Sequence, residues 1–560
     1  MKKNVSVVIE KNTEEQYARL MKSLNGMFLP NNMVCSIIVI DDSSNLYSSY
    51  NEFQSKNSDE YRVYISSKVE EISQNIIMKL LICLMENDDC AMVGVHGAVL
   101  PLDGDIYKAS SIYGQYLCCN DASGTVNGKK NLFDQEVEVL DSGIFATSID
   151  ISWDTDMGIF AVAAQCLKAK KLKKKTMVVM CDTPAVSYYT SSDFDTASIS
   201  TDYSLQLQRF YERYVYDLNP LVSVYIPTYN APHYLKQALD SVLNQDYPNI
   251  EILIGDDSTD SRTREMMKEY ASFPQIQYFF HSGPLGENGY YNSQFLLNKS
   301  KGQYINCLLH DDLLHPKKIS AMMTVLKADI NNEIGAVAST RTYINSKGKK
   351  IGLAGPWHPV DDTLLTGNEV IYKVLFNSVN FIGETTTVLQ RRDTYCSFDG
   401  DIILGGYYYE MRDRYMGDIS MWLDILRHKN IMFLSESLSS FRIHDAQNTN
   451  NLNMVCGCVI NWLNFIVITW LHKEFITSEK QLHSCMINWS NQHEYNIHRC
   501  LNADVDEDMK RCLKNLYNYV ANKEYEKVID LSIRFIMEKC DGEDIKYMCK
   551  RNKMGLWERR

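Results

Sequence analysis

The 560-residue sequence lacks the motifs that mark a protein built around bound zinc or redox-active thiols. Its 16 cysteines are scattered, with no C-x-x-C pair and no histidine spacing of the zinc-finger kind. Basic character is also missing, because the formal net charge is −13. Repulsion from phosphates therefore argues against a protein that binds nucleic acid over its whole surface. We expect reduced, mostly buried thiols and no nucleic-acid partner.

Targeting and membrane-spanning segments are hard to find as well. The apolar run at the N-terminus ends at Glu10, which is too short for the apolar core of a signal peptide. One later segment, Met454–Leu471, is long and apolar, but it contains Asn461 and Asn464 and falls short of the ~20 residues that a bilayer requires. We expect a helix packed in the protein core. These patterns predict a cytoplasmic protein without a transmembrane segment and leave peripheral membrane contact open.

The most informative residues are two acidic pairs, Asp256 with Asp257 and Asp311 with Asp312, each of which follows a short apolar run typical of a buried strand. In an open parallel α/β sheet, ligands bind beyond the carboxyl ends of the strands. Carboxylates gathered there repel one another unless a cation or hydrogen-bond donors compensate. The pattern therefore predicts a site for a charged ligand. Its segments are VSVYIPTYN (222–230), EILIGDDSTD (251–260) and YINCLLHDDLLHP (304–316).

The first two hundred residues repeat the start of this pattern, with VSVVI at residues 5–9 and SIIVIDDSSN at residues 36–45. The interval from Ser6 to Asp41 is nearly the same as the interval from Ser223 to Asp256. Two copies of one βαβ beginning in a single chain indicate a tandem duplication.

The two copies differ at the second acidic pair. Aligning CAMVGVHGAVLP (90–101) with CLLHDDLLHP (307–316), proline on proline, places His96 and Gly97 at the positions of Asp311 and Asp312. We expect the first copy to lack the second acidic cluster.

Helical periodicity appears in three further places. Residues 233–244 have the spacing of an amphipathic helix, and residues 203–216 read as a helix that links the two copies. Beyond about residue 450 the pattern becomes helical, and residues 513–537 predict two helices with a break near Asn522.

The second copy resembles a family 2 glycosyltransferase with the GT-A fold. The resemblance extends in order through VSVYIPTYN, LDSVLNQDYPN, EILIGDDSTD, the region of Asn292 and Gly302, HDDLLHP, IGETTTVLQRR (382–392), GDISMWLDIL (417–426) and LSSFRIH (438–444). The first copy is similar only at DDSS and in general layout. The resemblance implies an α/β protein with tandem GT-A (Rossmann-like) domains followed by an α-helical C-terminal region. We place a degenerate GT-A-like domain at 1–200, a helical linker at 201–220, the catalytic domain at 221–450 and a helical module at 451–560.

The resemblance also implies roles for individual residues. Residues that match the positions holding the base and ribose of the nucleotide-sugar are Pro227, Thr228, Tyr229 and Asp257, with Asp256 supporting their loop. Asp311 matches the metal-binding acid, and Asp312 beside it is assigned to the metal as well. His444 matches a position near the diphosphate, where it is expected to bind the metal or to donate to a phosphate. Leu309 stands where the family usually has an acid, and His310 is expected to compensate for the missing ribose contact.

Asp418 falls on the family's general-base position. Glu384, Trp422 and Asn292 are assigned to the acceptor and donor pocket, with core packing an equal alternative for Trp422. A general base of this kind contributes ~10²–10⁴ in rate, and attack on the anomeric carbon inverts its configuration. Mn²⁺ or Mg²⁺ is the expected cofactor, because a divalent cation neutralises the departing diphosphate.

The expected reaction is therefore transfer from a UDP-sugar, UDP-GlcNAc or a similar hexose donor, to a hydroxyl of a bacterial surface glycan or surface protein. The absence of a Q-x-x-R-W motif and of clustered spans predicts that one or a few sugars are added before release. Alternatives are a bifunctional two-site glycan polymerase and a protein O-glycosyltransferase acting on flagellin or an adhesin. A nucleotidyltransferase is less favoured, since PTYN replaces the usual G-x-G-T-R loop, as is a non-catalytic binding protein, since Asp257, Asp311 and Asp418 remain.

Overall fold

In a computed structural model, the chain forms two compact units. They are the N-terminal unit (residues 1–219) and the C-terminal unit (residues 220–560). The structure describes residues 3–118, 125–189, 193, 202–539, 550–551 and 557–558, apart from residues 12, 32, 42–44, 356, 396, 399–400, 403, 405–406, 410, 414, 445–446 and 448–450. The DDSS motif of the first copy therefore lies outside the described residues except for Asp41.

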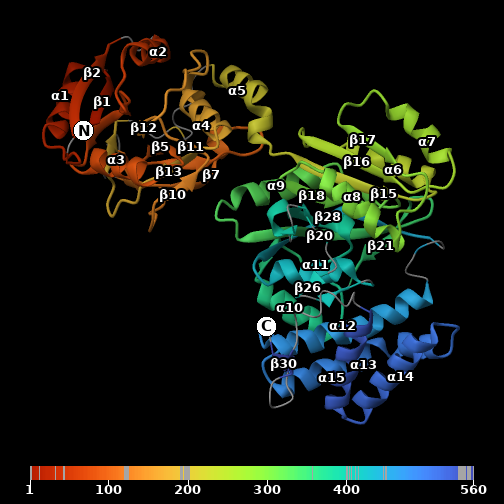
Figure 1. The fold of residues 1–560 in the computed structure, drawn as a ribbon. Helices are drawn as coiled ribbons and strands as arrows, with labels where there is room; N and C mark the ends of the chain where they lie inside the picture. The colour runs from red at the N-terminus through yellow and green to blue at the C-terminus, as the bar shows by residue number, and fades with distance from the viewer. Residues whose placement is uncertain are drawn as a thin grey trace. The chain divides into compact units, whose positions relative to one another are not determined.

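The N-terminal unit is built on a seven-stranded sheet with the order β10-β13-β5-β12-β3-β1-β2 (Figure 1). In chain order these strands are β1 Lys3–Glu10, β2 Met33–Ile40, β3 Tyr61–Ile65, β5 Cys90–Gly94, β10 Gln135–Val137, β12 Ile144–Thr147 and β13 Lys175–Val178. Its helices are α1 Glu14–Leu24, α2 Leu46–Lys56, α3 Ile76–Glu86, α4 Ala161–Lys171 and α5 Tyr203–Leu218. Two smaller sheets contain β4 Val69–Ile72, β14 Val186–Tyr188, β8 Tyr116–Cys118 and β9 Thr125–Asn127, and β11 Val139–Leu140, β6 Gly97–Val99 and β7 Ser110–Tyr113.

The predicted helix at 203–216 is confirmed as α5, and it belongs to the core of the N-terminal unit. Phe210, Tyr214 and Leu218 recur at intervals of four residues, which places them on one face of the helix. All three are buried among the side chains of one hydrophobic cluster of this unit. The limits of the linker and of the four proposed domains stay predictions.

The C-terminal unit is built on a larger mixed sheet with the main order β17-β16-β15-β18-β23-β20-β28-β19. In addition, β21 pairs with β20, and β22 pairs with β28. Its strands are β15 Val222–Thr228, β16 Ile250–Asp256, β17 Ile276–Phe280, β18 Tyr304–Cys307, β19 Leu313–Leu314, β20 Ile334–Asn345, β21 Lys350–Ala354, β22 Thr363–Leu365, β23 Leu389–Arg391 and β28 Asn430–Ile443. The helices around it are α6 Pro232–Leu243, α7 Arg262–Met267, α8 Tyr290–Lys299, α9 Lys318–Ala328, α10 Gly367–Asn377 and α11 Gly417–Leu426. The predicted amphipathic helix after PTYN is confirmed as α6, with Leu235, Ala238, Leu239 and Val242 buried.

The predicted helical end of the chain is confirmed as α12 Leu452–His472, α13 Glu479–Leu501, α14 Glu507–Ala521 and α15 Tyr525–Lys539. The break predicted near Asn522 is the C-cap of α14. Figure 1 shows these helices in blue, gathered beside α10 and α11 of the same unit. One hydrophobic cluster includes buried residues of α10, α11 and all four C-terminal helices, so the helical module and this side of the sheet share a core.

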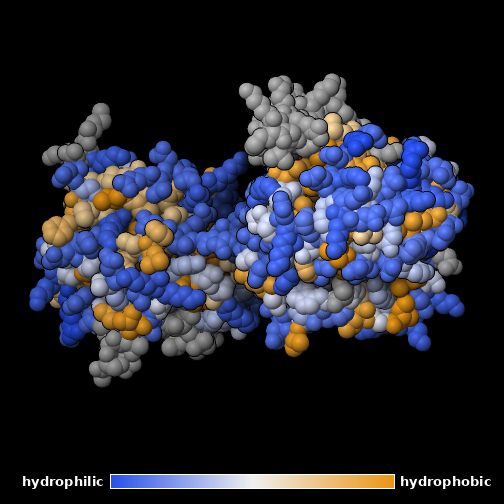
Figure 2. All heavy atoms as spheres, turned by 90° about the horizontal axis from the view of Figure 1, so that it is seen from below, coloured by the Kyte–Doolittle hydropathy of each residue, from blue (hydrophilic) through white to orange (hydrophobic). Residues whose placement is uncertain are grey.

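Helix α12 is long and apolar enough to cross a membrane, but most of its residues are buried inside the structure. On the face of the C-terminal unit seen in Figure 2, hydrophilic side chains predominate and hydrophobic ones form separate patches. The predicted packing of Met454–Leu471 as a core helix agrees with this burial.

The strand order corrects the alignment of the two copies. In the C-terminal unit, β18 lies parallel to β15, and the antiparallel β23 separates β18 from β20. In the N-terminal unit, β3 lies parallel to β1, and the antiparallel β12 separates β3 from β5. The counterpart of β18 is therefore β3, and the alignment of residues 90–101 with 307–316 is wrong, because β5 corresponds to β20.

The residues that follow β3 are Ser66, Ser67 and Lys68. The first copy therefore lacks acids directly after this strand, as expected, but the residue that takes the place of an acid is a lysine and not His96. The Lys68 Nζ lies 3.0 Å from Asp141 Oδ2 and 2.8 Å from Asp193 Oδ1. Burial opposes the charged form of Asp141, but the Lys68 charge, the neighbouring His96 and two backbone N–H donors together outweigh it, so the pKa of Asp141 lies below its ordinary value.

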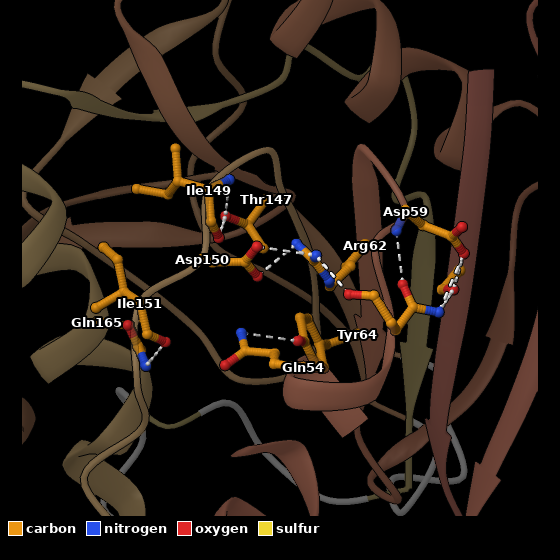
Figure 3. Close-up of polar contacts among 11 residues, drawn as sticks. Gln54, Asp59, Arg62, Tyr64, Thr147, Ile149, Asp150, Ile151 and Gln165 are labelled. Carbon is orange, nitrogen blue, oxygen red and sulfur yellow. Dashed lines mark hydrogen bonds and ion pairs between the residues drawn. The ribbon is translucent and has the colours of Figure 1, made fainter. Parts of the chain in front are cut away.

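A second polar cluster of the N-terminal unit lies at the opposite edge of the sheet. Arg62 at the start of β3 forms an ion pair with Asp150 at 2.9 Å, and Figure 3 shows its guanidinium directed at that carboxylate. Gln54 of α2 donates to the Tyr64 hydroxyl, and Gln165 of α4 donates to the Ile151 carbonyl oxygen. A small pocket beside these contacts is lined by Gln54, Met92, Thr147, Ile149, Ile151, Trp153 and Gln165. Since it lies at the amino end of β3, it is on the side away from the expected ligand edge.

We predict that Lys68→Met destabilises the N-terminal unit by about 3–5 kcal/mol at pH 7, because it leaves two buried carboxylates without their counter-ion. The loss should shrink as the pH falls, since protonation removes both negative charges. Lys56→Met is the control, because the Lys56–Glu52 pair is exposed and contributes little. Urea-dependent hydrogen exchange in β3 and β12 measures both variants. Equal losses, or a loss that does not depend on pH, would contradict this role of Lys68.

Candidate active site

The first acidic pair lies at the carboxyl ends of β15 and β16. The Asp257 N–H donates to the Thr228 carbonyl oxygen at 3.0 Å, which ties the two strand ends together. The Asp256 carboxylate accepts the Ser258 N–H at 2.9 Å and the Tyr278 hydroxyl. Asp256 is therefore engaged on both oxygens and holds the loop that carries Asp257.

Asp257 and Thr228 offer polar atoms that the described protein does not use. Both side chains are buried, and Asp257 Oδ1 and Thr228 Oγ1 have no hydrogen-bond partner among the described residues. Burial raises the pKa of Asp257. Since buried polar atoms almost always have a partner, these two are suited to meet a bound ligand. Pro227 precedes them in β15, and the side chain of Tyr229 beyond them is 48% exposed.

Asn292 lies behind this edge. Asn292 belongs to helix α8, and its Nδ2 donates to the Gly255 carbonyl oxygen at 2.8 Å. A Cβ at Gly255 would approach Asn292 Oδ1 to 1.9 Å, so only glycine permits this contact. Asn292 thus anchors α8 to the strand that ends at Asp256.

The second acidic pair follows β18, and its first member lies beside a histidine from the end of β28. His444 Nε2 is 2.9 Å from Asp311 Oδ2. Both side chains are mostly buried, at 12% and 16% exposure. The Nδ1 of His310 lies 3.3 Å from the Pro227 carbonyl oxygen, which can only accept a hydrogen bond. Burial lowers the pKa of His310, so this histidine joins the loop after β18 to strand β15 as a neutral group.

Asp312 points into the protein. One carboxylate oxygen accepts the Thr386 hydroxyl at 2.7 Å, and the other accepts the Arg442 N–H at 3.0 Å. Burial and the neighbouring charges of Asp311 and Glu384 hold its pKa well above the ordinary value. Asp312 therefore fastens the loop to β28 and to the short turn at Thr385–Thr387.

Leu309 packs against the hydrophobic cluster around Tyr225 and Leu253, and its N–H donates to Thr386 Oγ1 at 3.1 Å. An acid in this place would lose that apolar packing, which gives a physical reason for leucine here.

Glu384 lies between the second acidic pair and helix α11. Its carboxylate forms an ion pair with Arg341 Nε at 2.9 Å and accepts the Thr387 hydroxyl. Trp422 is buried in the hydrophobic core on α11, and its Nε1 donates to the Gly383 carbonyl oxygen at 3.3 Å. The structure therefore places Trp422 in core packing that supports the turn next to Glu384.

Asp418 is the second residue of α11. Its Oδ1 accepts the Ile419 N–H at 2.9 Å, while within the described part of the chain Oδ2 receives only Asn380 Nδ2, at 3.5 Å. Burial raises the pKa of Asp418 to about 6, with further contributions from the charges of Asp413 and Glu384. Because Glu384 acts on both Asp312 and Asp418, the second acidic pair and Asp418 belong to one electrostatic cluster.

Comparison with known families matches both copies. Residues 6–214 match a glycosyltransferase-like family, and residues 223–394 match glycosyl transferase family 2, so together the two matches span well over half of the chain. The chain carries two glycosyltransferase domains in tandem, and the second is a family 2 domain.

Individual relatives of this glycosyltransferase are distant. A glycosyltransferase of Rickettsia typhi is 27% identical over 44% of this chain and 72% of its own length. Chondroitin synthase of Escherichia coli is 31% identical over 25% of this chain and only 20% of its own length. The structure of Staphylococcus aureus TarS with UDP-GlcNAc covers 61% of this chain and 99% of that chain, at 13% identity and a TM-score of 0.34. An overlap that low assigns no residue in this glycosyltransferase.

Several residues of this site were missed from the sequence. Arg442 is fully buried, and its guanidinium donates to the Asp311 carbonyl oxygen and to Gln237 Oε1. Lys318 is also fully buried, with its Nζ 3.1 Å from Asn306 Oδ1, and Asn306 in turn donates to the carbonyl oxygens of the Thr385–Thr387 turn. Arg442 could have been found, since it precedes His444 by one strand period. Lys318 could not, because the adjacent Lys317 looks the same in sequence but is exposed.

The Lys318 ammonium predicts a pH dependence of stability. Burial lowers its pKa to about 7 in the folded protein, below the value of an unfolded lysine. Between these two values the unfolded chain holds the extra proton, so this group makes the wild type more stable as the pH rises.

We therefore expect the free energy of unfolding of Lys318→Met to fall relative to that of the wild type between pH 7 and pH 10, by about 1 kcal/mol for each pH unit. Urea unfolding at three pH values measures this difference, with Lys317→Met as the exposed control. A constant difference across the range would show that Lys318 is charged in the folded state.

Proposed function

We propose that the C-terminal unit transfers a sugar from a UDP-sugar, UDP-GlcNAc or a similar hexose donor, to a hydroxyl of a bacterial surface glycan or surface protein, with inversion at the anomeric carbon. The observation that carries this proposal is Asp418. Its carboxyl is half-buried, and desolvation raises its pKa to about 6, in one electrostatic cluster with the second acidic pair. A general base works best when its pKa lies near the working pH.

The nucleotide is proposed to bind at the carboxyl ends of β15 and β16. The acceptor Asp257 Oδ1 and the hydroxyl Thr228 Oγ1 have no partner among the residues that the structure describes, and the exposed Tyr229 ring offers a surface for a base. His310 lies next to Pro227 and is proposed to contact the ribose in place of the missing acid at Leu309.

Asp311 and His444 are the two residues proposed to hold Mn²⁺ or Mg²⁺. They fit this role because a carboxylate oxygen and an imidazole nitrogen from separate strands lie 2.9 Å apart. No cluster of three or more such side chains occurs in the part of the chain that the structure describes, so diphosphate oxygens and water would complete the coordination. When bound, the cation neutralises charge on the departing UDP. Asp312 contributes by fixing the loop.

In the proposed reaction, Asp418 takes the proton of the acceptor hydroxyl. The acceptor oxygen forms a bond to the anomeric carbon, and the bond from that carbon to the diphosphate oxygen breaks, releasing UDP. We propose a cytoplasmic enzyme with peripheral membrane contact left open, as the sequence predicts.

A two-site glycan polymerase is the second candidate, because both copies match glycosyltransferase families and one relative is a chondroitin synthase. The Lys68 cluster argues against it, since a lysine in the N-terminal unit follows the strand that carries the acids in the C-terminal unit.

We predict that Asp311→Ala abolishes UDP release with Mn²⁺ present, while Asp41→Ala, a change in the acidic pair that the first copy retains, only weakens it. Donor screening by UDP release measures both variants. Equal losses would favour two active centres, and pyrophosphate release from a nucleoside triphosphate would favour a nucleotidyltransferase. A thermal shift with UDP and Mn²⁺ but no turnover, even with water as acceptor, would favour a binding protein.

Asp418→Asn should lower the rate of transfer by about 10²–10⁴ while leaving donor binding intact, because the amide cannot accept the proton. In the wild type, kcat should fall as the pH drops through about 6, where Asp418 becomes protonated. A profile of kcat against pH tests both statements. Full activity of Asp418→Asn would exclude Asp418 as the base.

A further inference from the structure

The C-terminal helices contact the chain segment that leads into the proposed base. Near the end of α12, the Tyr408 hydroxyl and Thr469 Oγ1 are 2.9 Å apart, and the Tyr409 ring stacks on His472 with centroids at 3.8 Å. Toward the start of α12, a Cβ at Gly457 would lie 2.2 Å from the Tyr415 ring. The described residues between Tyr408 and Met416 therefore lie along α12, with Tyr408 at the end of this helix and Tyr415 near its start.

Asp413 is the centre of this contact. It is 5% exposed, and its carboxylate accepts the Asn461 Nδ2 from α12. The same carboxylate accepts the N–H of Tyr415 at 2.8 Å and of Met416 at 3.0 Å. Met416 immediately precedes α11, so Asp413 fixes the turn from which that helix starts. Asn464 donates to Asn461 Oδ1 at 2.9 Å and orients the amide.

Asp413 is not itself suited to meet a substrate, because both of its oxygens are occupied by donors of the protein. Asp418, only two residues beyond Met416, has a carboxylate oxygen that receives only a long contact of 3.5 Å, from Asn380 Nδ2, among the described residues. The position of that oxygen depends on where α11 begins, and this start depends on Asp413.

We propose that Asn461 and Asp413 are positioning residues through which the C-terminal helical module sets the geometry and the proton affinity of Asp418. This inference rests on the proposed function of Asp418 as the base. Among the described residues, the charged groups that face Asp418 are Asp413 and Glu384, the Cys458 thiol of α12 also acts on it, and its polar neighbours are the Ile419 N–H and Asn380. A misplacement of about 1 Å at a reacting group can lower a rate 100-fold, so a support of this kind affects catalysis strongly.

Two substitutions of Asp413 separate its charge from its hydrogen bonds. Asp413→Asn keeps one acceptor for the turn but removes a negative charge near Asp418. It should retain kcat within a few-fold and move the acidic limb of the kcat profile to lower pH. Asp413→Ala removes the acceptor as well, and kcat should fall on the order of 10–100-fold. The KM for the donor should change little in both variants, since β15 and β16 are not involved.

Asn461→Leu tests the contribution of α12 with matched volume. It should lower kcat about tenfold or more at an unchanged donor KM. Ile466→Ala is the control, because Ile466 is buried on the same helix but about 140° around its axis from Asn461. It should lower the melting temperature without changing kcat or the pH profile of the folded enzyme at 20 °C.

The inference is overturned if Asn461→Leu and both Asp413 variants keep the wild-type kcat and acidic limb, or if Ile466→Ala changes them equally. Asp418→Asn distinguishes this result from a failure of the proposed function. If that variant is inactive while the Asp413 and Asn461 variants are normal, Asp418 remains the base and only the positioning role is lost. If Asp418→Asn is fully active, the proposed base itself is wrong.

Discussion

Repulsion between carboxylates at one edge of a sheet is the constraint on which the C-terminal unit depends. In this unit, hydrogen-bond donors and a cation from distant parts of the chain compensate the repulsion. Asp312 is fully satisfied by Thr386 and the Arg442 N–H, and Glu384 is paired with Arg341. The Arg442 guanidinium is directed at the Asp311 carbonyl oxygen and leaves the Asp311 carboxylate to His444. One carboxylate of the pair is therefore neutralised by the fold, and the other remains suited to a cation.

The N-terminal unit meets the same constraint in another way. Its strands follow the same order around the first strand, yet the loop after β3 carries a lysine that pairs with two buried aspartates. The Lys68 ammonium is a permanent part of the N-terminal unit, whereas the metal ion proposed for the C-terminal unit would bind together with the diphosphate of the donor. Two sheets of one topology can thus hold either an internal ion cluster or a ligand site, depending on a few residues after one strand. This difference explains why fold alone does not assign chemistry to both copies.

Local patterns predicted the elements of this fold well, because apolar periodicity and turn residues are properties of short segments. Helices α5, α6, α12, α14 and α15 and the strands before the acidic pairs were found in this way. The alignment of the first copy failed because Tyr61–Ile65 and Cys90–Gly94 are both short, fully buried strands, and sequence does not show which of them lies next to β1. In the site, Lys318 and Asp413 act through partners far away in the chain, so only the folded structure reveals them.

Helix α12 shows how one set of residues can have two interpretations. Asn461, Asn464 and Thr469 interrupt an apolar helix that otherwise has the length and composition of a membrane span. Each polar group has a use in the structure: Asn461 binds Asp413, Asn464 orients Asn461, and Thr469 contacts Tyr408. The spacings of three residues from Asn461 to Asn464 and eight residues from Asn461 to Thr469 bring these groups to one side of the helix. The face that carries them is the face that lies against the segment before Asp418, while the opposite face packs on α13, where Trp489 Nε1 donates to the Val459 carbonyl oxygen. An apolar helix with one polar stripe therefore allows α12 to be buried and also to hold the segment that precedes the proposed base, Asp418.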